Sequence, residues 1–406
     1  MLKLSDLVRV SESQQKALAS KKNLVQRDLM QSINLEHKSH ALIISGIRRC
    51  GKSTLLGQII SQHQLNAFYI NFDTPKLYNF ELRDFELLDK LIETSGNDTL
   101  CFDEIQVVEG WELYIRQKLD QNYRILITGS NASLLSKELG TKLTGRHITK
   151  ELFPFSFPEF LRFFSLAANE KNFDKYISQG GFPEYLKTKD STVLTSLIDD
   201  ILYRDIAVRY NIRNTKVLKH LLVFLISNVG NLITAGKLAK ALGVKSTATL
   251  LDYFSYFEQS YLITLLPKFS YSHRAQLINP RKIYFIDTGM IKAASASFTN
   301  NSGHKLENII FSELRRKNHS LYYFNENGKE CDFVVTKDSK VIQLIQVCYQ
   351  FTLDNQDREI NGLLEAMDFF SKTEGLIITL NQEDIIIHKD KKIIVVPAHK
   401  FILSLK

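Results

Sequence analysis

The amino-acid sequence predicts an α/β protein of several domains, in which a parallel β-sheet flanked by helices comes first. Short apolar strands at 41–45, 67–72, 99–102 and 124–128 are separated by helix-length intervals, which is typical of a parallel sheet. The first of these strands runs through a glycine-bounded loop into a helical pattern. The chain has 406 residues, which is too long for one ordinary domain, so two to four domains are expected.

The loop after the first strand has the pattern of a phosphate-binding loop. It comprises Gly46, Ile47, Arg48, Arg49, Cys50, Gly51, Lys52, Ser53 and Thr54. Backbone N–H groups of such a loop surround an anion, the next helix directs its positive end at it, and Lys52 would reach the β- and γ-phosphates. Ser53 would offer its hydroxyl to Mg²⁺. The sequence therefore predicts binding of ATP with Mg²⁺, the alternative being a glycine turn with a surface lysine.

The strand at 99–102 ends in two adjacent carboxylates, Asp103 and Glu104. This is the Walker B arrangement, in which Asp103 would hold the magnesium shell and Glu104 would orient or deprotonate the attacking water. Phosphoryl transfer needs mainly positioning and charge neutralisation, and two carboxylates at a strand end can supply both. The alternative is an acidic pair that faces solvent.

The strand at 124–128 runs into small polar residues. One of Thr128, Ser130 and Asn131 is expected to sense the γ-phosphate or its water, and we take Asn131 as the candidate; the alternative is a simple turn. Further along, Arg146 follows a glycine and is a candidate for stabilising charge on the nucleotide of this chain or of a neighbouring subunit. An ordinary surface salt bridge is the alternative for Arg146.

These motifs together resemble a widespread prokaryotic group of AAA-type ATPases with an AAA+ or STAND-like core. The resemblance includes Phe-Pro-Phe-Ser-Phe-Pro-Glu-Phe at 153–160, Gly-Gly-Phe-Pro-Glu at 180–184 and Tyr-Arg-Asp at 203–205, so it spans nearly the whole chain. The group carries a C-terminal domain of unknown function related to PD-(D/E)xK nucleases. The resemblance implies an N-terminal segment (1–20), a P-loop ATPase core (21–165), a helical lid or linker (166–214), a winged-helix-like domain (215–272) and a degenerate nuclease-like domain (273–406).

The middle of the chain supports the winged-helix interpretation independently. Apolar or amphipathic helices are expected at 217–227, 234–243 and 247–259, which is helix-turn-helix spacing. The third helix has no arginine or lysine, so its face lacks the usual donors for DNA, and we favour a packing module. DNA binding is the alternative, through Lys237, Lys240, Lys245, Arg274, Arg281 and Lys282. Asp287 is expected to be structural, where a strand enters a turn.

In the tail, the resemblance implies a degenerate nuclease-like site of Glu307, Asp332 and Gln346. Glu307 lies in a helical pattern at 304–317, and Asp332 and Gln346 lie in two strands that follow. An active member would carry an acid, a spacer and a lysine where this chain has Gln346, Val347 and Cys348. Because Gln346 removes a negative charge and Cys348 cannot replace a lysine, we do not expect DNA cleavage.

Composition limits the partners. The net charge of +8 comes from 52 basic and 44 acidic residues, so polyanions are favoured only mildly. No apolar run approaches the ~18 residues that span a bilayer, so no membrane association is expected. The cysteines Cys50, Cys101, Cys331 and Cys348 have no C-x-x-C spacing, which indicates a reducing cytoplasm.

The leading hypothesis is an ATP-hydrolysing switch whose nucleotide state changes the relation between the core and the two downstream domains. Completion of its site by a homo-oligomer or an unknown protein partner would explain slow hydrolysis. The alternatives are a nucleotide-regulated protein-interaction module with negligible turnover and an ATP-gated metal-dependent nuclease.

Overall fold

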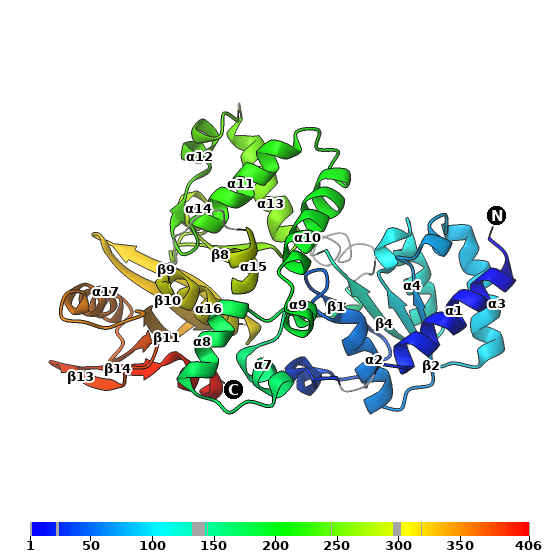
Figure 1. Cartoon of the computed structure of the whole chain (residues 1–406), viewed down its shortest axis with the longest axis horizontal. Coiled ribbons are helices and arrows are strands. Elements are labelled where there is room, and N and C mark those ends of the chain that lie inside the picture. Colours follow the sequence, from blue (N-terminus) through cyan, green and yellow to red (C-terminus); the bar gives the residue numbers. More distant parts are fainter. Residues whose placement is uncertain are drawn as a thin grey trace. The chain divides into compact units, whose positions relative to one another are not determined.

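The computed structural model describes residues 2–21, 24–131, 143, 145–244, 246–294, 302–317 and 319–405 (Figure 1). Lys245 and the side chain of Lys237, two of the basic residues considered for DNA binding, lie outside this part. The chain divides into two compact units, Met1–Phe153 with Gln259–Tyr261, and Pro154–Glu258 with Leu262–Lys406. Within the described residues, no helix is both long and apolar enough to cross a membrane.

The first unit contains a five-stranded sheet in which every pair of neighbours is parallel, as predicted. The strand order is β2-β3-β4-β1-β5. The strands are β1 (Ala41–Ser45), β2 (Ala67–Asn71), β3 (Thr99–Asp103), β4 (Arg124–Gly129) and β5 (His147–Glu151). The sequence did not predict β5, because this edge strand reads His-Ile-Thr-Lys-Glu and has none of the apolar run that marks the central strands.

Helices cover the sheet of the first unit. They are α1 (Leu4–Ala19), α2 (Lys52–Gln62), α3 (Phe85–Ser95) and α4 (Trp111–Asp120), with short 3-10 helices at Asp28–Ser32, Pro75–Leu77, Leu82–Asp84 and Ile105–Val107. The expected N-terminal segment is thus largely the helix α1, which lies beside α2 (Figure 1). Its Gln14 side chain bonds both the N–H and the C=O of Asn71 at 2.8 and 2.9 Å, and its Leu18 lies against Gly57.

The second unit begins with a run of helices. They are α7 (Phe157–Phe164), α8 (Glu170–Gln179), α9 (Pro183–Thr188), α10 (Thr192–Asp200) and a π-helix, η5 (Ile201–Val208). The proline-rich segment starts α7 rather than interrupting it, because Pro158 sits in the first turn, where no backbone N–H is needed. Ser156 caps this helix, and Glu159 bonds back to the Ser156 N–H at 2.9 Å.

The middle region combines helices with a small antiparallel sheet of order β6-β8-β7. Its elements are α11 (Thr215–Ser227), β6 (Leu232–Ile233), α12 (Ala235–Ala241), α13 (Thr247–Gln259), β7 (Ile263–Leu266), α14 (His273–Ile278), β8 (Arg281–Phe285) and α15 (Thr288–Ala294). The three helices expected from the sequence are present within a residue or two of the expected bounds.

Asp287 is structural, but the segment after β8 is a helix start rather than the expected turn. The Asp287 carboxylate accepts hydrogen bonds from the N–H groups of Gly289 and Met290 at 2.9 and 3.2 Å, and so caps α15. It also accepts the N–H of Gly181 at 2.6 Å, which joins two sequence motifs more than a hundred residues apart. A Cβ on Gly181 would lie 2.1 Å from the carbonyl oxygen of Phe155, so this junction requires glycine.

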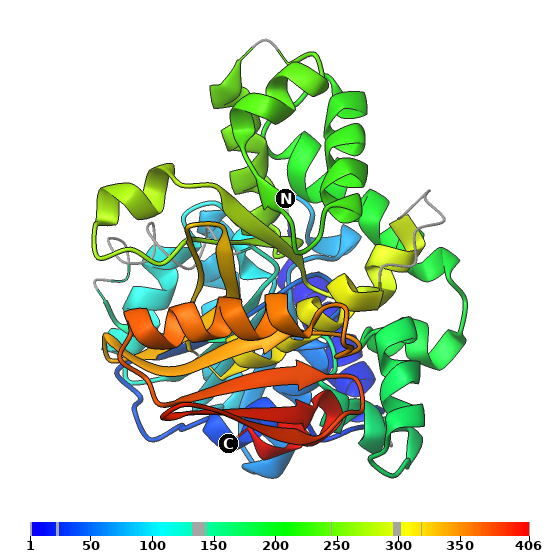
Figure 2. The same cartoon turned by 90° about the vertical axis from the view of Figure 1, so that its left-hand side faces the viewer.

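The tail is built on a six-stranded mixed sheet of order β13-β14-β12-β11-β10-β9. Its elements are α16 (Ser302–Arg316), β9 (Ser320–Glu326), β10 (Lys329–Lys337), β11 (Lys340–Val347), α17 (Gln356–Phe369), β12 (Glu374–Thr379), β13 (Asp384–His388), β14 (Lys391–Pro397) and α18 (Ala398–Ser404). Figure 2 shows α17, in orange, running across one face of this sheet, where Leu363 and Met367 pack over buried strand residues.

Candidate functional site

The order of the parallel strands brings the predicted nucleotide motifs together. β4 lies between β1 and β3, and all three strands run in the same direction. The segments that follow their carboxyl ends therefore meet at one edge of the sheet. These segments carry the loop before Lys52, the carboxylate of Glu104 and the hydroxyl of Ser130.

Close backbone packing fixes the shape of the loop. Gly46 has a φ of 146°, and a Cβ there would lie 2.1 Å from the carbonyl oxygen of Leu152. Gly51 has a φ of 106°, which also favours glycine. Arg27 is buried and donates to the carbonyl oxygens of Cys50 and Phe153 at 2.9 and 2.6 Å, so it ties the loop to the end of the unit. The sequence analysis missed Arg27, because no motif surrounds it.

Lys52 is buried, with 5% of its surface exposed, and its ammonium lies over the loop. The Nζ atom donates to the carbonyl oxygens of Gly46 and Ile47 at 3.1 and 3.2 Å and lies 3.4 Å from Glu104 Oε1. Burial lowers the pKa of Lys52, but neighbouring acidic groups, of which the Glu104 carboxylate has the largest effect, together outweigh burial and keep the pKa above its ordinary value. The group is therefore a cation whose carbonyl partners can be exchanged for phosphate oxygens.

Glu104 faces Lys52 and is held by neighbouring side chains. Its Oε2 accepts hydrogen bonds from Gln106 and from Ser130 Oγ, the latter at 3.1 Å. Burial raises the pKa of Glu104, yet Lys52 and these hydrogen bonds bring it below its ordinary value. The carboxylate is consequently ionised at neutral pH and able to accept a proton or a hydrogen bond from water.

Asp103 is fully buried, and three side chains bind its carboxylate. Oδ2 accepts hydrogen bonds from Tyr69 Oη at 2.8 Å and Asn71 Nδ2 at 2.9 Å, and Oδ1 accepts the hydroxyl of Thr128. A carboxylate has about four acceptor positions, so these three donors, counted among the described residues, leave one position unused. Together with the Ser53 hydroxyl in the first turn of α2, this fits Mg²⁺, which usually keeps several waters and takes few protein ligands. The sequence analysis missed Tyr69 and Asn71, although Asn71 pairs with Asp103 in the sheet register.

The structure separates the remaining predicted residues. Thr128 and Ser130 touch the two carboxylates, and Asn131 is buried just beyond β4. Arg146 lies at the amino ends of the strands, where its carbonyl oxygen accepts the N–H of Ala41, the first residue of β1, at 3.1 Å. Its guanidinium pairs with Asp120 at 2.8 Å. About five residues of extended strand separate Arg146 from the loop, which favours a role towards a neighbouring subunit, and that role stays a prediction.

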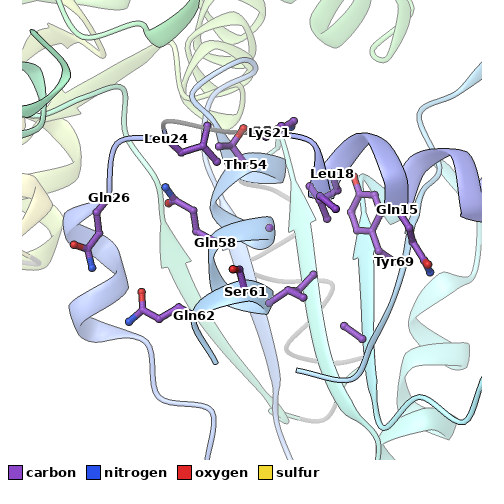
Figure 3. A pocket seen from close by; sticks show the side chains of 14 residues that line it. Gln15, Leu18, Lys21, Leu24, Gln26, Thr54, Gln58, Ser61, Gln62 and Tyr69 are labelled. Atoms are coloured by element: carbon purple, nitrogen blue, oxygen red, sulfur yellow. Dashed lines mark hydrogen bonds between the residues drawn. The ribbon is translucent and has the colours of Figure 1, made fainter. Parts of the chain in front are cut away.

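A pocket of about 530 Å³ lies along α2, the helix that follows the loop (Figure 3). Residues of α1, of the segment before Arg27, of α2 and of β2 line it. Thr54 lies at its rim, with Lys21 Nζ 3.4 Å from the Thr54 hydroxyl, and Tyr69 lines it while bonding Asp103. Gln58 donates to the carbonyl oxygen of Val25 at 2.8 Å, but its own buried Oε1 has no hydrogen-bond partner among the residues that the structure describes.

In the second unit, the residues of the degenerate nuclease-like site also lie together. Gln346 Oε1 accepts the N–H of Asp332 at 3.1 Å, and Glu307 and Asp332 both contact the ammonium of Lys282, at 3.1 and 2.6 Å. From the sequence, Lys282 was a candidate for binding DNA. The structure instead buries it, with 2% of its surface exposed.

Comparison with known proteins finds three family matches, one after another along the chain. The model of an AAA domain matches residues 38–161. Two domains of unknown function, DUF8612 and DUF4143, match residues 170–301 and 302–401. Neither family description mentions nucleases, so the relation of the tail to nucleases remains a resemblance.

Two relatives match over nearly their whole length. The uncharacterized protein MJ1544 of Methanocaldococcus jannaschii is 37% identical over 393 residues, covering 89% of this chain and 88% of that protein. An uncharacterized protein of Haemophilus influenzae is 31% identical, covering 88% of this chain and 93% of that protein. The crystal structure of Cdc6p from Pyrobaculum aerophilum covers 72% of this chain and 97% of its own, but its TM-score of 0.29 at 14% identity carries no argument. The chain thus belongs to the family of MJ1544, and its first unit carries the AAA domain of an AAA-type ATPase.

Proposed function

We propose that the protein binds Mg-ATP in the loop after β1, hydrolyses it, and uses the nucleotide state as a switch on its middle region and tail. The observation that carries this proposal is the buried ammonium of Lys52, seated on loop carbonyls and 3.4 Å from the Glu104 carboxylate. An incoming γ-phosphate would take over the ammonium, and Glu104 would be released towards the attacking water.

The other predicted residues have roles that follow from their positions. The N–H groups of the loop and of the first turn of α2 would hold the phosphates. Ser53 and Asp103 would hold Mg²⁺, Asp103 through a bound water, and the metal would neutralise charge on the phosphates when bound. Ser130 holds Glu104, so Asn131 stays the candidate for sensing the γ-phosphate. An arginine for the transition state would have to come from elsewhere, for which a second copy of the chain is our proposal.

The pocket beside Thr54 is our candidate for the nucleoside. Leu18 and Leu24 provide apolar surface for a flat base, and the unpartnered Oε1 of Gln58 is an acceptor. The exocyclic amino group of adenine is a donor, whereas the corresponding position of guanine is an acceptor, so the pocket favours ATP over GTP. In Gln58→Leu we expect this preference to shrink, which competition between the two nucleotides measures.

Glu104→Gln tests hydrolysis directly. We expect the wild-type protein to hydrolyse Mg-ATP and the variant to lose turnover while it still binds ATP, because the amide keeps the shape and loses the basic oxygen. Glu109→Gln, which changes an exposed carboxylate in the same unit, is the matched control and should retain turnover. Assays with and without added DNA determine whether nucleic acid stimulates the reaction. Equal turnover in wild type and Glu104→Gln would contradict the proposal.

A protein-interaction module is the second candidate, and an apolar groove in the middle region favours it. The groove has a volume of about 450 Å³ and is lined partly by α13 and α14. Three of its leucine and isoleucine side chains are more than half exposed: Leu251, Leu277 and Ile278. Such surface suits an apolar partner better than nucleic acid. ATP binding by the wild-type protein without measurable turnover would favour this candidate.

A further inference from the structure

The tail contains a buried cluster in which three carboxylates surround one ammonium. Lys282 Nζ lies 3.1 Å from Glu307 Oε1, 2.7 Å from Glu330 Oε1 and 2.6 Å from Asp332 Oδ1. An ammonium has three N–H donors, so these three contacts satisfy it completely. Lys282 thus has no donor left for a ligand.

Each carboxylate is also fixed by a second donor. Tyr284 Oη bonds Glu307 at 2.6 Å, Asn325 bonds Glu330 at 3.1 Å, and the N–H of Val347 bonds Asp332 at 2.9 Å. These donors orient the carboxylate oxygens towards one point, as a metal site does with its ligands. The ammonium of Lys282 occupies that point.

The charges favour a cation at this position. Three carboxylates face one lysine, so negative charge is in excess even though burial raises the pKa of Glu307 to about 7, against the effect of Lys282. Burial lowers the pKa of Lys282, but the carboxylates of Asp332 and Glu307 raise it well above its ordinary value. The lysine therefore stays charged, and removing it would leave an uncompensated anionic pocket.

We propose that the ammonium of Lys282 permanently occupies the position where a divalent cation would otherwise bind in the tail, so that the pocket excludes metal. Within the described residues, no group of three or more His, Cys, Asp or Glu side chains is arranged to hold a metal ion. The three carboxylates around Lys282 are partners of its ammonium and not ligands of a bound metal ion. This proposal does not depend on the proposed ATPase activity.

The same contact fastens two regions of the second unit. Lys282 belongs to β8 of the small sheet, whereas Glu307 lies on α16 and Glu330 and Asp332 lie on β10 of the tail. With a metal ion in place of the ammonium, Glu330 and Asp332 would lose their ion pair with β8, and Glu307 would keep only its hydrogen bond from Tyr284. The lysine therefore gives the tail an ion-pair connection to the middle region that a bound metal could not provide.

Binding of Mn²⁺, measured by electron paramagnetic resonance without nucleotide, tests the proposal. Glu330→Gln marks the pocket, because Glu330 is the most exposed of the three carboxylates and its loss should be tolerated. In the wild-type protein we expect no bound Mn²⁺ that depends on Glu330. The amount of bound Mn²⁺ should therefore be the same in the wild type and in Glu330→Gln. Mn²⁺ that is bound by the wild type and lost in Glu330→Gln would overturn the proposal, whether or not any lysine variant folds.

Lys282→Ala is the complementary variant. We expect it to bind one additional Mn²⁺, at least tenfold more tightly than the tail of the wild-type protein binds this ion. The double variant that combines Lys282→Ala with Glu330→Gln should not bind this additional Mn²⁺. Lys268→Ala is the matched control, because Lys268 pairs with a single carboxylate among the described residues, that of Glu326, at 2.9 Å on a partly exposed surface. A folded Lys282→Ala that binds no more Mn²⁺ than Lys268→Ala would also overturn the proposal.

Discussion

Two buried lysines, Lys52 in the first unit and Lys282 in the second, have the same charge and different partners. Lys52 lies on two neutral carbonyl oxygens and one carboxylate, at 3.1, 3.2 and 3.4 Å. Lys282 lies among three carboxylates, at 2.6 to 3.1 Å. The contacts of Lys52 are longer, and most of its partners are uncharged. The contacts of Lys282 are shorter, and the charge of its three partners exceeds that of the ammonium.

This difference separates a ligand-binding lysine from a structural one. A phosphate can displace carbonyl oxygens from Lys52, because it offers the ammonium more negative charge than they do. No anion improves on three carboxylates at Lys282, so that charge belongs to the framework. Burial alone therefore does not identify a binding lysine; the charge of its partners does.

The largest expected effect is on folding at Lys282. In Lys282→Met, the free energy of unfolding should fall by about 3–5 kcal/mol, because the buried carboxylates of Glu307 and Asp332 and the half-buried carboxylate of Glu330 lose their counter-ion. Chemical denaturation followed by circular dichroism, with hydrogen exchange of β10 amides, measures this change. The control Lys268→Met should lose only about 0–1 kcal/mol, as expected for a partly exposed pair. Equal losses in the two variants would contradict the distinction.

The next effect is on binding at Lys52. In Lys52→Met, affinity for a fluorescent ATP analogue should fall roughly 10–100-fold, since hydrogen bonds to a charged group contribute about 1.5–3 kcal/mol. Lys38→Met, which removes a surface lysine 3.8 Å from Asp98, should bind like the wild type. Unchanged affinity in Lys52→Met would show that the ammonium does not contact the phosphates.

Asp287 extends the comparison to a buried anion whose partners are backbone N–H groups. Burial raises its pKa from 3.8 to about 6. The folded protein therefore keeps a proton that the unfolded chain releases, so the contribution of this group to stability is complete below pH 3.8 and lost as pH rises through about 6.

In Asp287→Asn we expect a loss of about 1–3 kcal/mol near neutral pH, because the amide cannot accept all three N–H groups. The decline in stability between about pH 4 and pH 6 should be smaller than in the wild type. Urea denaturation across this range measures both effects. A wild-type slope that the substitution leaves unchanged would show that Asp287 does not titrate there.

The smallest expected effect is at Tyr69. Tyr69→Phe removes one of the three donors to Asp103, which is worth about 0.5–1.5 kcal/mol, so turnover should fall by roughly tenfold or less. The Mg²⁺ concentration for half-maximal turnover should shift with it, because Asp103 is freer to move. A loss as complete as that in Glu104→Gln would mean that Tyr69 takes part in the reaction itself.

The sequence predicted those features of the first unit that depend on local pattern. Apolar runs identified the central strands, and the spacing of Gly46, Gly51 and Lys52 identified the loop. The outer strand β5 lacks such a run and was not predicted. Without β5, the sequence could not show that Arg146 lies at the amino ends of the strands, away from the loop. Arg27, Tyr69 and Asn71 were missed for a different reason: each acts through a contact between distant segments.

In the tail, the resemblance located Glu307, Asp332 and Gln346, which the structure brings together. It did not locate Lys282, which lies 25 residues before Glu307 and 50 before Asp332. A lysine in an apolar strand looks like a surface residue until the partner strands are placed. The charge balance of the cluster is thus a property of the tertiary structure, and no local motif reveals it.

Isothermal calorimetry of Mg-ATP on the intact chain tests the central claim, that the loop after β1 captures a triphosphate, most directly. We predict saturable binding of one nucleotide per chain, strongly weakened in Lys52→Met. The absence of any binding heat from ATP or GTP, with the wild-type protein shown to be folded, would contradict it.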